Sequence, residues 1–505
     1  MSSRPLAESD QYLAPRTASI IDGEAPPSAD QGGFMLPVID PTDEQQISEL
    51  READAAEVDA AVRAARRAFD SGPWPRMDVD ERNAILYEIF AKLTAHAEEL
   101  ALLEVRNTGL TLAGARMHAR RAAVNFRSFA EFASTLCGQT FTQNSKFLTY
   151  VTREPKGVGA LISPWNAPLA LASMRVATCI AFGNTCVLKP SEFAPLQIHR
   201  MVELFHEAGL PPGVVNLVNG RGGVTGAALT GHSDIDMIGF TGGTETARAI
   251  LATAGANLKP SIMELGGKSA SIVTANADLD QALDGVLNGI YGGNGQQCLA
   301  GSRILVQRSI APAFIERFVE RTRAMRIGDP LLAETELGPL ANAPHRARVL
   351  GFVDVARADG AELLTGGKPA EAFERGYFVE PTAVLTRDNK ARINQEEIFG
   401  PFASLQTFDT VDEAIAIAND SVFGLVAYVW SNDIYEIQRC SRGIRAGTVW
   451  VNTPVFREVR APFGGYKQSG IGRDGMTSSA EFFTELKTTS IPYDPVTMPR
   501  LGAGA

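Results

Sequence analysis

Apolar residues follow a helical spacing in the first third of the chain. In Glu57–Phe69 they recur at intervals of three and four, which predicts an amphipathic helix. Two longer helical stretches are expected at Asp80–Glu104 and Arg116–Ser134. Residues 1 to about 55 are rich in Pro, Gly and Asp, and they predict an irregular lead-in with short strands.

From Val158 onward, short apolar runs alternate with amphipathic segments such as Leu196–Ala208. This alternation predicts parallel strands joined by crossover helices. The first strands are expected at Val158–Ile162, Thr185–Leu188, Val214–Val218 and Met237–Phe240. A second series is expected at Ala270–Val273, Ile304–Val306, Ala403–Phe408, Val426–Trp430 and Thr448–Val451. The pattern indicates two consecutive α/β domains that meet near Glu264.

The composition narrows the class of protein. The 505 residues are 45% hydrophobic and 21% charged, as is usual for a soluble globular protein of several domains. A net charge of −11 argues against nucleic acid as a partner. No apolar run approaches the ~20 residues of a membrane span, and no secretory signal is expected at the start of the chain.

Cysteine and histidine usage adds two expectations. The five cysteines form no Cys-x-x-Cys pair, which favours free thiols in a reducing compartment, the cytoplasm. The six histidines show no metal-ligand spacing, so no metal site is expected. None of the histidines lies in a glycine-rich segment, which leaves no candidate for a Cys–His couple.

The strongest chemical signal is Cys298, which lies in the polar, glycine-rich segment Gly292–Arg303. A structural cysteine normally sits in an apolar run instead. Glu264 precedes it by 34 positions and is followed by Leu265, Gly266 and Gly267. Glycine allows sharp turns and close approach of the backbone. The two segments therefore predict a nucleophile and a general base that meet on backbone turns.

Other candidate groups follow predicted strands, where ligands of α/β sheets bind. Asn166 follows the first strand, and its amide is either an oxyanion donor or a turn residue. Lys189 and Glu192 follow the second strand. They either hold a ribose, in which case the carboxylate favours NAD over NADP, or form an ordinary exposed pair.

Three further segments carry weaker signals. Thr241-Gly242-Gly243 opens a helix at about Glu245, where backbone amides favour a pyrophosphate, although two glycines alone are weak evidence. Glu397 and Phe399 fit contacts to a ribose and a nicotinamide, or an ordinary loop. The segment Arg460–Arg473 holds too many glycines for a helix or strand and predicts a shaped loop.

In order and spacing, these motifs resemble those of the aldehyde dehydrogenase superfamily over nearly the whole chain. The matching segments are Pro164–Asn166, Lys189–Glu192, Phe240–Thr244, Glu264–Lys268, Gly295–Cys298, Glu397–Pro401 and Pro462–Gly465. The resemblance implies that Cys298 is the nucleophile, that Glu264 is the base for thioester hydrolysis, and that Asn166 helps to form the oxyanion hole.

The resemblance also implies an NAD site, with NADP as an alternative cofactor. Its residues would be Ile162, Ser163, Trp165, Lys189, Ser191, Glu192, Phe240, Thr241, Gly242, Gly243, Leu265, Gly266, Glu397 and Phe399. Gly243 stands where the family usually has serine, and Asp474 where it commonly has glutamate. Neither difference removes a catalytic group.

The implied fold is α/β, with two Rossmann-like domains and a small β oligomerisation arm. The expected division is a cofactor-binding domain at 1–134 and 154–264, a catalytic domain at 265–477, an arm at 135–153 and 478–493, and a tail at 494–505. Lys146–Arg153 alternates as a strand that could pair across subunits, so a homodimer or homotetramer is expected.

The segment from Arg457 to Gly465 is similar to that of the hydroxymuconic semialdehyde type of aldehyde dehydrogenase. This similarity predicts an aldehyde substrate with a carboxylate, held by Arg121 and by Arg460 or Arg457, with Phe463 in the pocket. Guanidinium groups suit this task because they bind carboxylates through two hydrogen bonds. The same arginines could instead form internal ion pairs.

Four functions remain open at this point. The leading one is NAD-dependent oxidation of a semialdehyde to a carboxylic acid, and the alternative is a general aldehyde dehydrogenase for uncharged substrates. A CoA-acylating relative is disfavoured by Glu264, because a thioester meant for CoA has no use for a base that activates water. A non-catalytic relative is disfavoured by the intact Cys298, Glu264 and Asn166.

Overall fold

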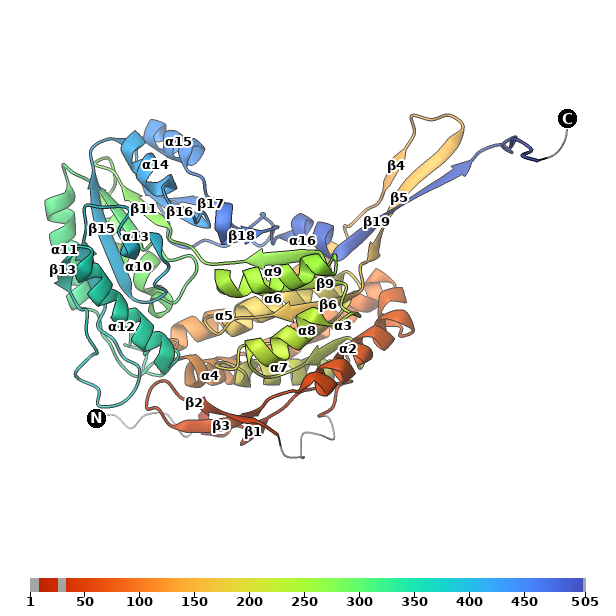
Figure 1. Ribbon diagram of the computed structural model, residues 1–505, viewed down its shortest axis with the longest axis horizontal. Helices are drawn as coiled ribbons and strands as arrows, with labels where there is room; N and C mark the ends of the chain where they lie inside the picture. Colours follow the sequence, from red (N-terminus) through yellow and green to blue (C-terminus); the bar gives the residue numbers. More distant parts are fainter. Residues whose placement is uncertain (1–8, 26–32, 503–505) are drawn as a thin grey trace.

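The computed structural model describes residues 9–25 and 33–502. Residues 1–8 and 26–32 of the expected lead-in, and 503–505 of the expected tail, lie outside the described residues. The described chain forms two α/β lobes, a small sheet near the N-terminus and a protruding arm (Figure 1).

The first lobe is built on a six-stranded sheet with the order β18-β10-β9-β6-β7-β8. Its strands are β6 (Val158–Ile162), β7 (Thr185–Lys189), β8 (Val215–Leu217), β9 (Met237–Thr241), β10 (Ser261–Glu264) and β18 (Gly470–Ile471). All neighbours are parallel except β18, which runs antiparallel to β10. The four strands predicted for this region are confirmed.

Helices cover both faces of this sheet because its strands are apolar on both sides. In β6, Leu161 packs into one core and Ala160 into the other. The first core is completed by α3 (Val79–Ala95), α4 (Ala97–Thr108), α5 (Leu112–Ala133), α6 (Pro168–Ala181) and α7 (Leu196–Glu207). The second is completed by α2 (Ala55–Asp70), α8 (Ala227–Gly231) and α9 (Thr244–Ala256). Short helical turns lie at Trp74–Arg76, whose Trp74 belongs to the first core, and at Gly222–Gly226.

The prediction of one helix over Asp80–Glu104 is wrong. The chain leaves the helical conformation at His96 (φ −101°, ψ 16°), where α3 ends and α4 begins. Neither glycine nor proline marks this break, so the apolar spacing runs through it unbroken. The His96 ring instead contacts Glu99 Oε2 in the first turn of α4, at 2.6 Å.

The second lobe holds a seven-stranded sheet with the order β13-β14-β15-β12-β11-β16-β17. Its strands are β11 (Ala270–Val273), β12 (Arg303–Gln307), β13 (Glu362–Thr365), β14 (Thr382–Leu385), β15 (Phe402–Phe408), β16 (Val426–Trp430) and β17 (Thr448–Val451). The five predicted strands are confirmed, and all neighbours are parallel except β13 and β14. The edge strand β13 and its neighbour β14 were not predicted.

The helices of the second lobe again cover both faces of the sheet. One face packs against α10 (Leu279–Tyr291) and α11 (Ala311–Arg323). The other packs against α12 (Ala343–Ala358), α14 (Val411–Asn419) and α15 (Ile434–Gly443). Short helical segments lie at Gly292–Gly295, Lys467–Ser469 and, as α13, Arg392–Gln395.

Two smaller sheets complete the fold. Near the N-terminus, β1 (Arg16–Thr17), β2 (Met35–Ile39) and β3 (Gln46–Arg51) form the short strands expected there. In the arm, β4 (Gln139–Phe141), β5 (Phe147–Pro155) and β19 (Thr484–Pro492) form an antiparallel sheet that projects from the first lobe (Figure 1). Helix α16 (Met476–Phe483) precedes β19 and contacts α6.

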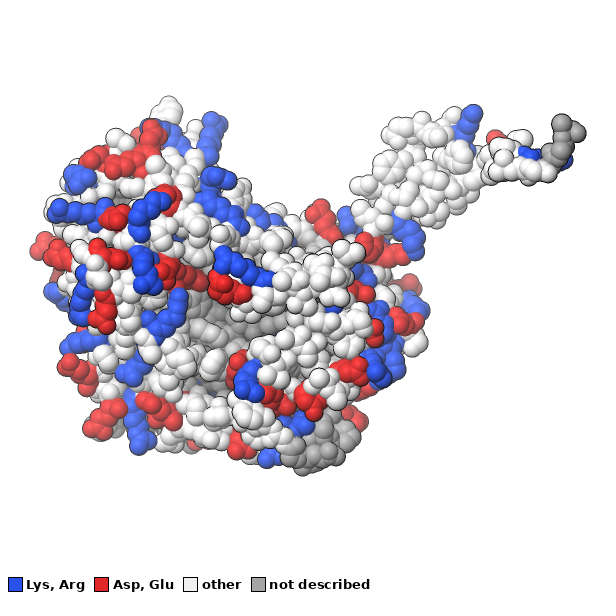
Figure 2. Space-filling model, viewed as in Figure 1, with Lys and Arg blue, Asp and Glu red and all other residues white. Residues whose placement is uncertain are grey.

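The connection between the two large sheets positions the site. Strand β10 ends at Glu264 and β11 begins at Ala270, so five residues join one sheet to the other. This short link brings the carboxyl ends of the first sheet opposite the amino ends of the second. The molecule is hollowed between the two lobes (Figure 2).

Candidate active site

A cavity of about 970 Å³ lies between the two facing sheet edges. From the first edge it is lined by residues at or just beyond the ends of β6, β9 and β10, including Asn166, Gly242 and Glu264. From the second edge it is lined by residues that precede β12 and β15, including Cys298 and Phe399. The predicted nucleophile and base therefore lie in one cavity.

Left-handed residues shape the loop that carries Cys298. Gly293, Asn294 and Gly295 have φ angles of 58°, 59° and 69°. A Cβ on Gly295 would lie 2.3 Å from the carbonyl carbon of Gly400, so only glycine fits there. The buried Asn294 side chain donates to the Gly109 and Pro339 carbonyls and accepts from the Gly338 N–H, at 2.8–3.0 Å. These bonds fix the loop to the rest of the protein.

The Cys298 thiol is held in its protonated form. Burial, together with the nearby carboxyl groups of Glu397 and Glu264, raises its pKa to about 12, and the positive charge of Arg457 opposes this shift. A thiolate is the reactive form of cysteine. Attack by Cys298 therefore requires a base or an added positive charge in the cavity.

Glu264 is a buried carboxyl group without a hydrogen-bond partner for Oε1 among the described residues. Burial and the neighbouring Asp474 raise its pKa well above the ordinary value, and three arginines oppose the shift. Gly464 packs so closely that a Cβ there would lie 2.6 Å from Oε1. A general base works best when its pKa is raised toward the operating pH, which is the direction seen here.

Asn166 lies beside the cysteine loop. Its Nδ2 donates to the Gln296 carbonyl at 2.8 Å, two residues before Cys298. The amide also lines the cavity. This contact holds the Asn166 amide beside the loop that carries Cys298.

The carboxyl edge of the first sheet offers a surface for a dinucleotide. Trp165, Thr241, Gly242 and Gly243 line the cavity there, together with Leu265 and Gly266. Gly243 precedes the first turn of α9, whose backbone amides point toward this edge. The order of strands reverses between β6 and β9, and such switch points are where α/β sheets bind nucleotides.

Glu397 and Phe399 lie on the opposite edge of the cavity. Glu397 Oε1 accepts from the Gly267 N–H at 2.9 Å, and burial raises its pKa to about 7. A Cβ on Gly266 would lie 2.1 Å from Glu397 Oε2. Phe399 (φ 66°) packs edge-on against Trp165, with ring centroids 5.4 Å apart. Residues predicted from separate motifs are thus in contact.

Six predicted cofactor residues lie at the strand ends but do not line the cavity itself: Ile162, Ser163, Lys189, Ser191, Glu192 and Phe240. Lys189 Nζ donates to the Pro190 carbonyl at 2.8 Å and lies 3.7 Å from Glu192 Oε2. The Lys189–Glu192 pair expected from the sequence is therefore formed at the end of β7.

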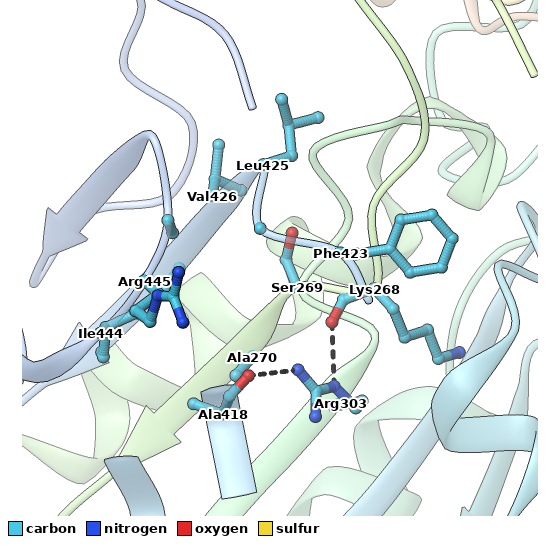
Figure 3. Close-up of a pocket in the computed structure, with 13 residues that line it drawn as sticks. Lys268, Ser269, Ala270, Arg303, Ala418, Phe423, Leu425, Val426, Ile444 and Arg445 are labelled. Atoms are coloured by element: carbon cyan, nitrogen blue, oxygen red, sulfur yellow. Dashed lines mark hydrogen bonds between the residues drawn. The ribbon is translucent and has the colours of Figure 1, made fainter. Parts of the chain in front are cut away.

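A second, much smaller pocket lies at the start of β11 (Figure 3). Arg303 is fully buried there and donates to the Lys268, Ile417 and Ala418 carbonyls at 2.8–2.9 Å. Burial lowers the pKa of Lys268 to about 7. These bonds, with one to Asn389 Oδ1 at 3.2 Å, explain how the amino edge accommodates the buried guanidinium of Arg303.

The predicted substrate arginines separate into two groups. Arg121 and Arg457 line the cavity, as does Phe463. Arg457 stacks on the Phe463 ring at 3.6 Å, and its buried Nη1 has no hydrogen-bond partner among the described residues. Arg460 does not line the cavity, because it is exposed and forms a bidentate pair with Glu458. The internal-pair interpretation thus applies to Arg460.

Sequence reasoning gave no place in the cavity to four residues that line it, Arg175, Asp474, His118 and His345. Arg175 is buried and bound to Asp474, and both line the cavity beside Glu264. His118 and His345 also line it, and His345 Nε2 contacts the Phe399 carbonyl at 2.7 Å. The arginine and the two histidines lie on helices α6, α5 and α12, away from glycine-rich segments. Among the four residues, the sequence drew attention only to Asp474, because it stands where the family commonly has glutamate.

The described residues contain no group of three or more His, Cys, Asp or Glu side chains arranged to hold a metal ion. In the same part of the chain, no helix has the length and apolar character needed to cross a membrane. A free thiol, a buried carboxyl group and a nucleotide-type sheet edge meet in one cavity of this α/β protein, as in an enzyme that pairs a nucleophilic side chain with a nucleotide.

Comparisons with known proteins identify the family. The model of the aldehyde dehydrogenase family matches residues 28–489. Betaine aldehyde dehydrogenase of Bacillus subtilis is 41% identical over 459 residues, which cover 89% of this chain and 92% of the relative. The 5-carboxymethyl-2-hydroxymuconate semialdehyde dehydrogenase of Escherichia coli is 40% identical over 441 residues, covering 86% and 93%.

Solved structures of similar proteins point to the same family. HpcC from Thermus thermophilus superimposes with a TM-score of 0.94 at 40% identity, over 98% of this chain and 97% of that chain. Betaine aldehyde dehydrogenase of Staphylococcus aureus, solved in complex with NAD+, gives 0.95 at 36% identity over 99% of both chains. The chain belongs to the aldehyde dehydrogenase family, whose members are oxidoreductases that act on the aldehyde group.

Proposed function

We propose that this enzyme oxidises a carboxylate-bearing aldehyde to the corresponding acid with NAD, using Cys298 as nucleophile and Glu264 as base. Glu264 takes the thiol proton, and the Cys298 sulfur forms a bond to the aldehyde carbon. The Asn166 amide and the Cys298 backbone N–H stabilise the resulting oxyanion. Their positions at one end of the cavity support these roles.

The remaining steps form the acid and restore the free thiol. The carbon gives a hydride, with two electrons, to the cofactor and becomes a thioester. Glu264 releases the thiol proton to solvent, and its carboxylate then removes a proton from water, whose oxygen attacks the thioester carbon. The C–S bond breaks, the acid leaves and the thiol is restored. The net change is aldehyde, NAD+ and water to acid, NADH and a proton.

The residues present fit a dinucleotide. Trp165 and the Thr241–Gly243 turn provide its surface, and the α9 N-terminus faces its phosphates. Lys189 and Glu192 would hold the adenosine ribose, and the carboxylate would disfavour the 2′-phosphate of NADP. Ile162, Ser163, Ser191, Phe240, Leu265 and Gly266 would complete this side. Glu397 would bind the second ribose, with Phe399 beside the nicotinamide, which supplies the hydride acceptor.

One observation carries the choice of substrate. Arg457 has a buried nitrogen without a partner among the described residues, and its neighbours include Cys298, Glu264 and Arg121. Leaving a buried donor unpaired costs about 1–3 kcal/mol, which a ligand oxygen would offset. A carboxylate is the anion whose two oxygens match a guanidinium. The semialdehyde type of relative fits this arrangement.

The test compares two arginines of the same segment. Arg457→Gln should lower kcat/KM for a semialdehyde by roughly 10- to 100-fold and leave an uncharged aldehyde of equal length within about threefold. Arg460→Gln is the matched control, because Arg460 is exposed and paired with Glu458. Equal effects of Arg457→Gln on both substrates would refute a carboxylate-bearing substrate.

The apolar part of the cavity lining favours a second candidate function, the oxidation of uncharged aldehydes. Leu171, Met174, Val455 and Phe463 line the same cavity and suit an uncharged aldehyde. A general aldehyde dehydrogenase would show specificity constants that do not depend on Arg457. The same measurements therefore separate the two functions.

The proposal extends to the organisation of the chain. We assign cofactor binding to 1–134 and 154–264, catalysis to 265–477, oligomerisation to 135–153 and 478–493, and a tail to 494–505. The arm exposes Phe141, Leu486 and Ile491, and few charges cover its visible face (Figure 2). Such a surface fits contact with further copies in a homodimer or homotetramer. The five free thiols fit a cytoplasmic enzyme.

A further inference from the structure

One turn of α12 holds three consecutive carbonyls of the loop that carries Glu397 and Phe399. His345 Nε2 lies 2.7 Å from the Phe399 carbonyl oxygen. Three residues further along the helix, Arg348 donates from Nη1 to the Ile398 carbonyl at 2.8 Å and from Nη2 to the Glu397 carbonyl. Residues three apart lie on one face of a helix, so both side chains reach the loop together. We call this arrangement the carbonyl clamp.

The hydrogen bond at His345 has a defined direction. A carbonyl oxygen can only accept, so Nε2 carries the hydrogen whether the ring is neutral or charged. Burial lowers the pKa of His345 to about 4, against the opposing effect of the Phe399 carbonyl. The ring is therefore neutral near pH 7 and donates one hydrogen bond to the loop.

The loop needs this support because its backbone is strained at Phe399. Its φ of 66° is left-handed, and Phe399 is the only aromatic residue with such an angle among residues 9–25 and 33–502. Bulky residues rarely adopt this conformation, and it persists only where the surroundings hold it. At the next residue, a Cβ on Gly400 would lie 2.7 Å from Val349 Cγ2 of α12. The helix therefore holds the loop by close packing as well as by hydrogen bonds.

The clamped loop lies between the cysteine loop and the carboxyl edge of the first sheet. A Cβ on Gly295 would lie 2.3 Å from the Gly400 carbonyl carbon, so the two backbones are in contact. The ring of Trp165 lies 5.4 Å from that of Phe399 and 4.9 Å from that of His345, measured between centroids. All three rings line the cavity. A shift of Phe399 would therefore move the cavity wall where the two edges meet.

We propose that His345 is a positioning residue for hydride transfer, which acts by holding the Phe399 ring beside the nicotinamide. This inference rests on the proposed function, in which Phe399 lies next to the nicotinamide and Cys298 holds the aldehyde carbon. His345 acts on the loop through the Phe399 carbonyl and takes no part in the bond changes. Hydride transfer is sensitive to such positioning, because a displacement of about 1 Å can cost roughly 100-fold in rate.

A bond that only ties α12 to the loop predicts a different outcome. It would stabilise the fold and support every reaction of Cys298 to the same degree. A positioning role instead affects the step that needs the nicotinamide. Attack of Cys298 on an activated ester, 4-nitrophenyl acetate, forms an acyl enzyme without hydride transfer. Ester hydrolysis in the absence of cofactor therefore separates the two roles.

The experiment uses the full-length enzyme with three substitutions at His345. His345→Phe keeps a ring beside Trp165 and removes the donor. His345→Asn also lacks the bond, because its amide is too short, whereas His345→Gln keeps an N–H donor at a similar reach. Arg357→Gln is the control, since Arg357 lies on the same helix, is exposed and pairs with Asp354. Thermal unfolding and amide hydrogen exchange of residues 396–402, both without cofactor, report on the structure.

We expect His345→Phe and His345→Asn to lower the single-turnover rate of NADH formation from glutarate semialdehyde by roughly 10- to 100-fold. Deuterium at the aldehyde carbon should slow this rate more strongly than in the wild type. Ester hydrolysis should change by less than about threefold. Hydrogen exchange of the loop should become severalfold faster, because the loop is held less tightly. His345→Gln should recover most of these losses, and Arg357→Gln should match the wild type.

A double-substitution cycle tests whether His345 acts through Phe399. In a Phe399→Ala background, the effect of His345→Phe on NADH formation should fall below about twofold, because the ring that it positions is gone. Full additivity of the two substitutions would overturn the inference.

Two further results would overturn it. One is an equal loss of NADH formation and ester hydrolysis in the variants without the bond, which would mean that the clamp only supports the fold. The other is an unchanged rate of NADH formation in the same variants. In both cases the proposed function stands if the wild type forms NADH and Cys298→Ala does not. If the wild type forms no NADH from the aldehyde, the proposed function fails and this inference fails with it.

Discussion

The two large sheets meet the cavity with opposite ends of their strands. In the first lobe β6, β9 and β10 end there, so Asn166, Gly242 and Glu264 lie at or just beyond their carboxyl ends. In the second lobe β11, β12 and β15 begin there, so Lys268, Cys298 and Phe399 precede their amino ends. One sheet follows the common rule for ligand sites in α/β proteins, and the other reverses it.

The reversal shows how different tasks are divided between the edges. The carboxyl edge has helix N-termini and short turns, which suit a phosphate-bearing cofactor. The amino edge has loops with left-handed residues, such as Gly293–Gly295, that place side chains where regular strands cannot. The five-residue link from Glu264 to Ala270 joins the edges. The proposed base, Glu264, therefore belongs to one edge and the proposed nucleophile, Cys298, to the other.

The largest expected effect comes from removing the base while the amino edge stays intact. Glu264→Gln should lower steady-state turnover by roughly 10²- to 10⁴-fold, because water is no longer activated for attack on the thioester. The pKa of Glu264 is raised, so the wild-type rate should rise with pH as this group loses its proton, and the variant should lose this dependence. Turnover is measured by NADH absorbance.

Rapid mixing of the enzyme with NAD and aldehyde separates thioester formation from thioester hydrolysis. For Glu264→Gln, NADH should form slowly and reach at most one equivalent per site, because the thiol also loses its base, and acylated Cys298 should then accumulate in the mass spectrum. Cys298→Ala is the control and should give no burst. Full steady-state turnover in Glu264→Gln would refute the assignment of Glu264, at the carboxyl edge, as the base.

A smaller effect should distinguish the loops of the two edges. Gly295→Ala places a Cβ against the Gly400 backbone at φ 69° and should destabilise the protein by about 2–4 kcal/mol. Gly243→Ala, on the carboxyl edge, meets open space at φ −75° and should change stability by only about 0.5 kcal/mol. Urea unfolding measures both. Similar losses for the two variants would show that the edges do not differ in strain.

The smallest effect concerns Glu397, an amino-edge group proposed to bind the cofactor. Its pKa is raised to about 7, so ribose hydroxyls should bind better once it is ionised. NAD affinity should rise roughly three- to tenfold between one pH unit below and one above that pKa, as measured by calorimetry. Glu397→Gln should flatten this profile. A wild-type affinity that falls with rising pH would contradict the assignment.

Sequence reasoning anticipated the carboxyl edge better than the amino edge. Strand ends can be read from apolar runs, so Asn166 and the Thr241–Gly243 turn were placed by a general rule. Cys298 and Glu397 lie before strands, where no such rule applies, and glycine content and family resemblance located them. The contact of Gly266 with Glu397 joins residues 131 positions apart, and it became visible only in three dimensions.

Residues on helix faces remained hidden for another reason. His118 and Arg175 fit the amphipathic pattern of their helices, and nothing in the spacing marks which polar position meets a cavity. Similarly, Arg457 and Arg460 are three residues apart in one segment, yet one lies in the cavity and the other pairs with Glu458. The break at His96 was missed because helix spacing continues on both sides of it.

The crossing points between the lobes have a mechanical consequence. The chain passes from the first lobe to the second at 265–269 and returns to β10 through β18, whose Gly470 pairs with Glu264. Both crossings therefore touch the base. If the lobes swing apart to exchange cofactor, the pivot lies beside Glu264, and displacement grows with distance from a pivot. Such a motion would change the separation of the thiol and the carboxyl group less than that of the outer cavity walls.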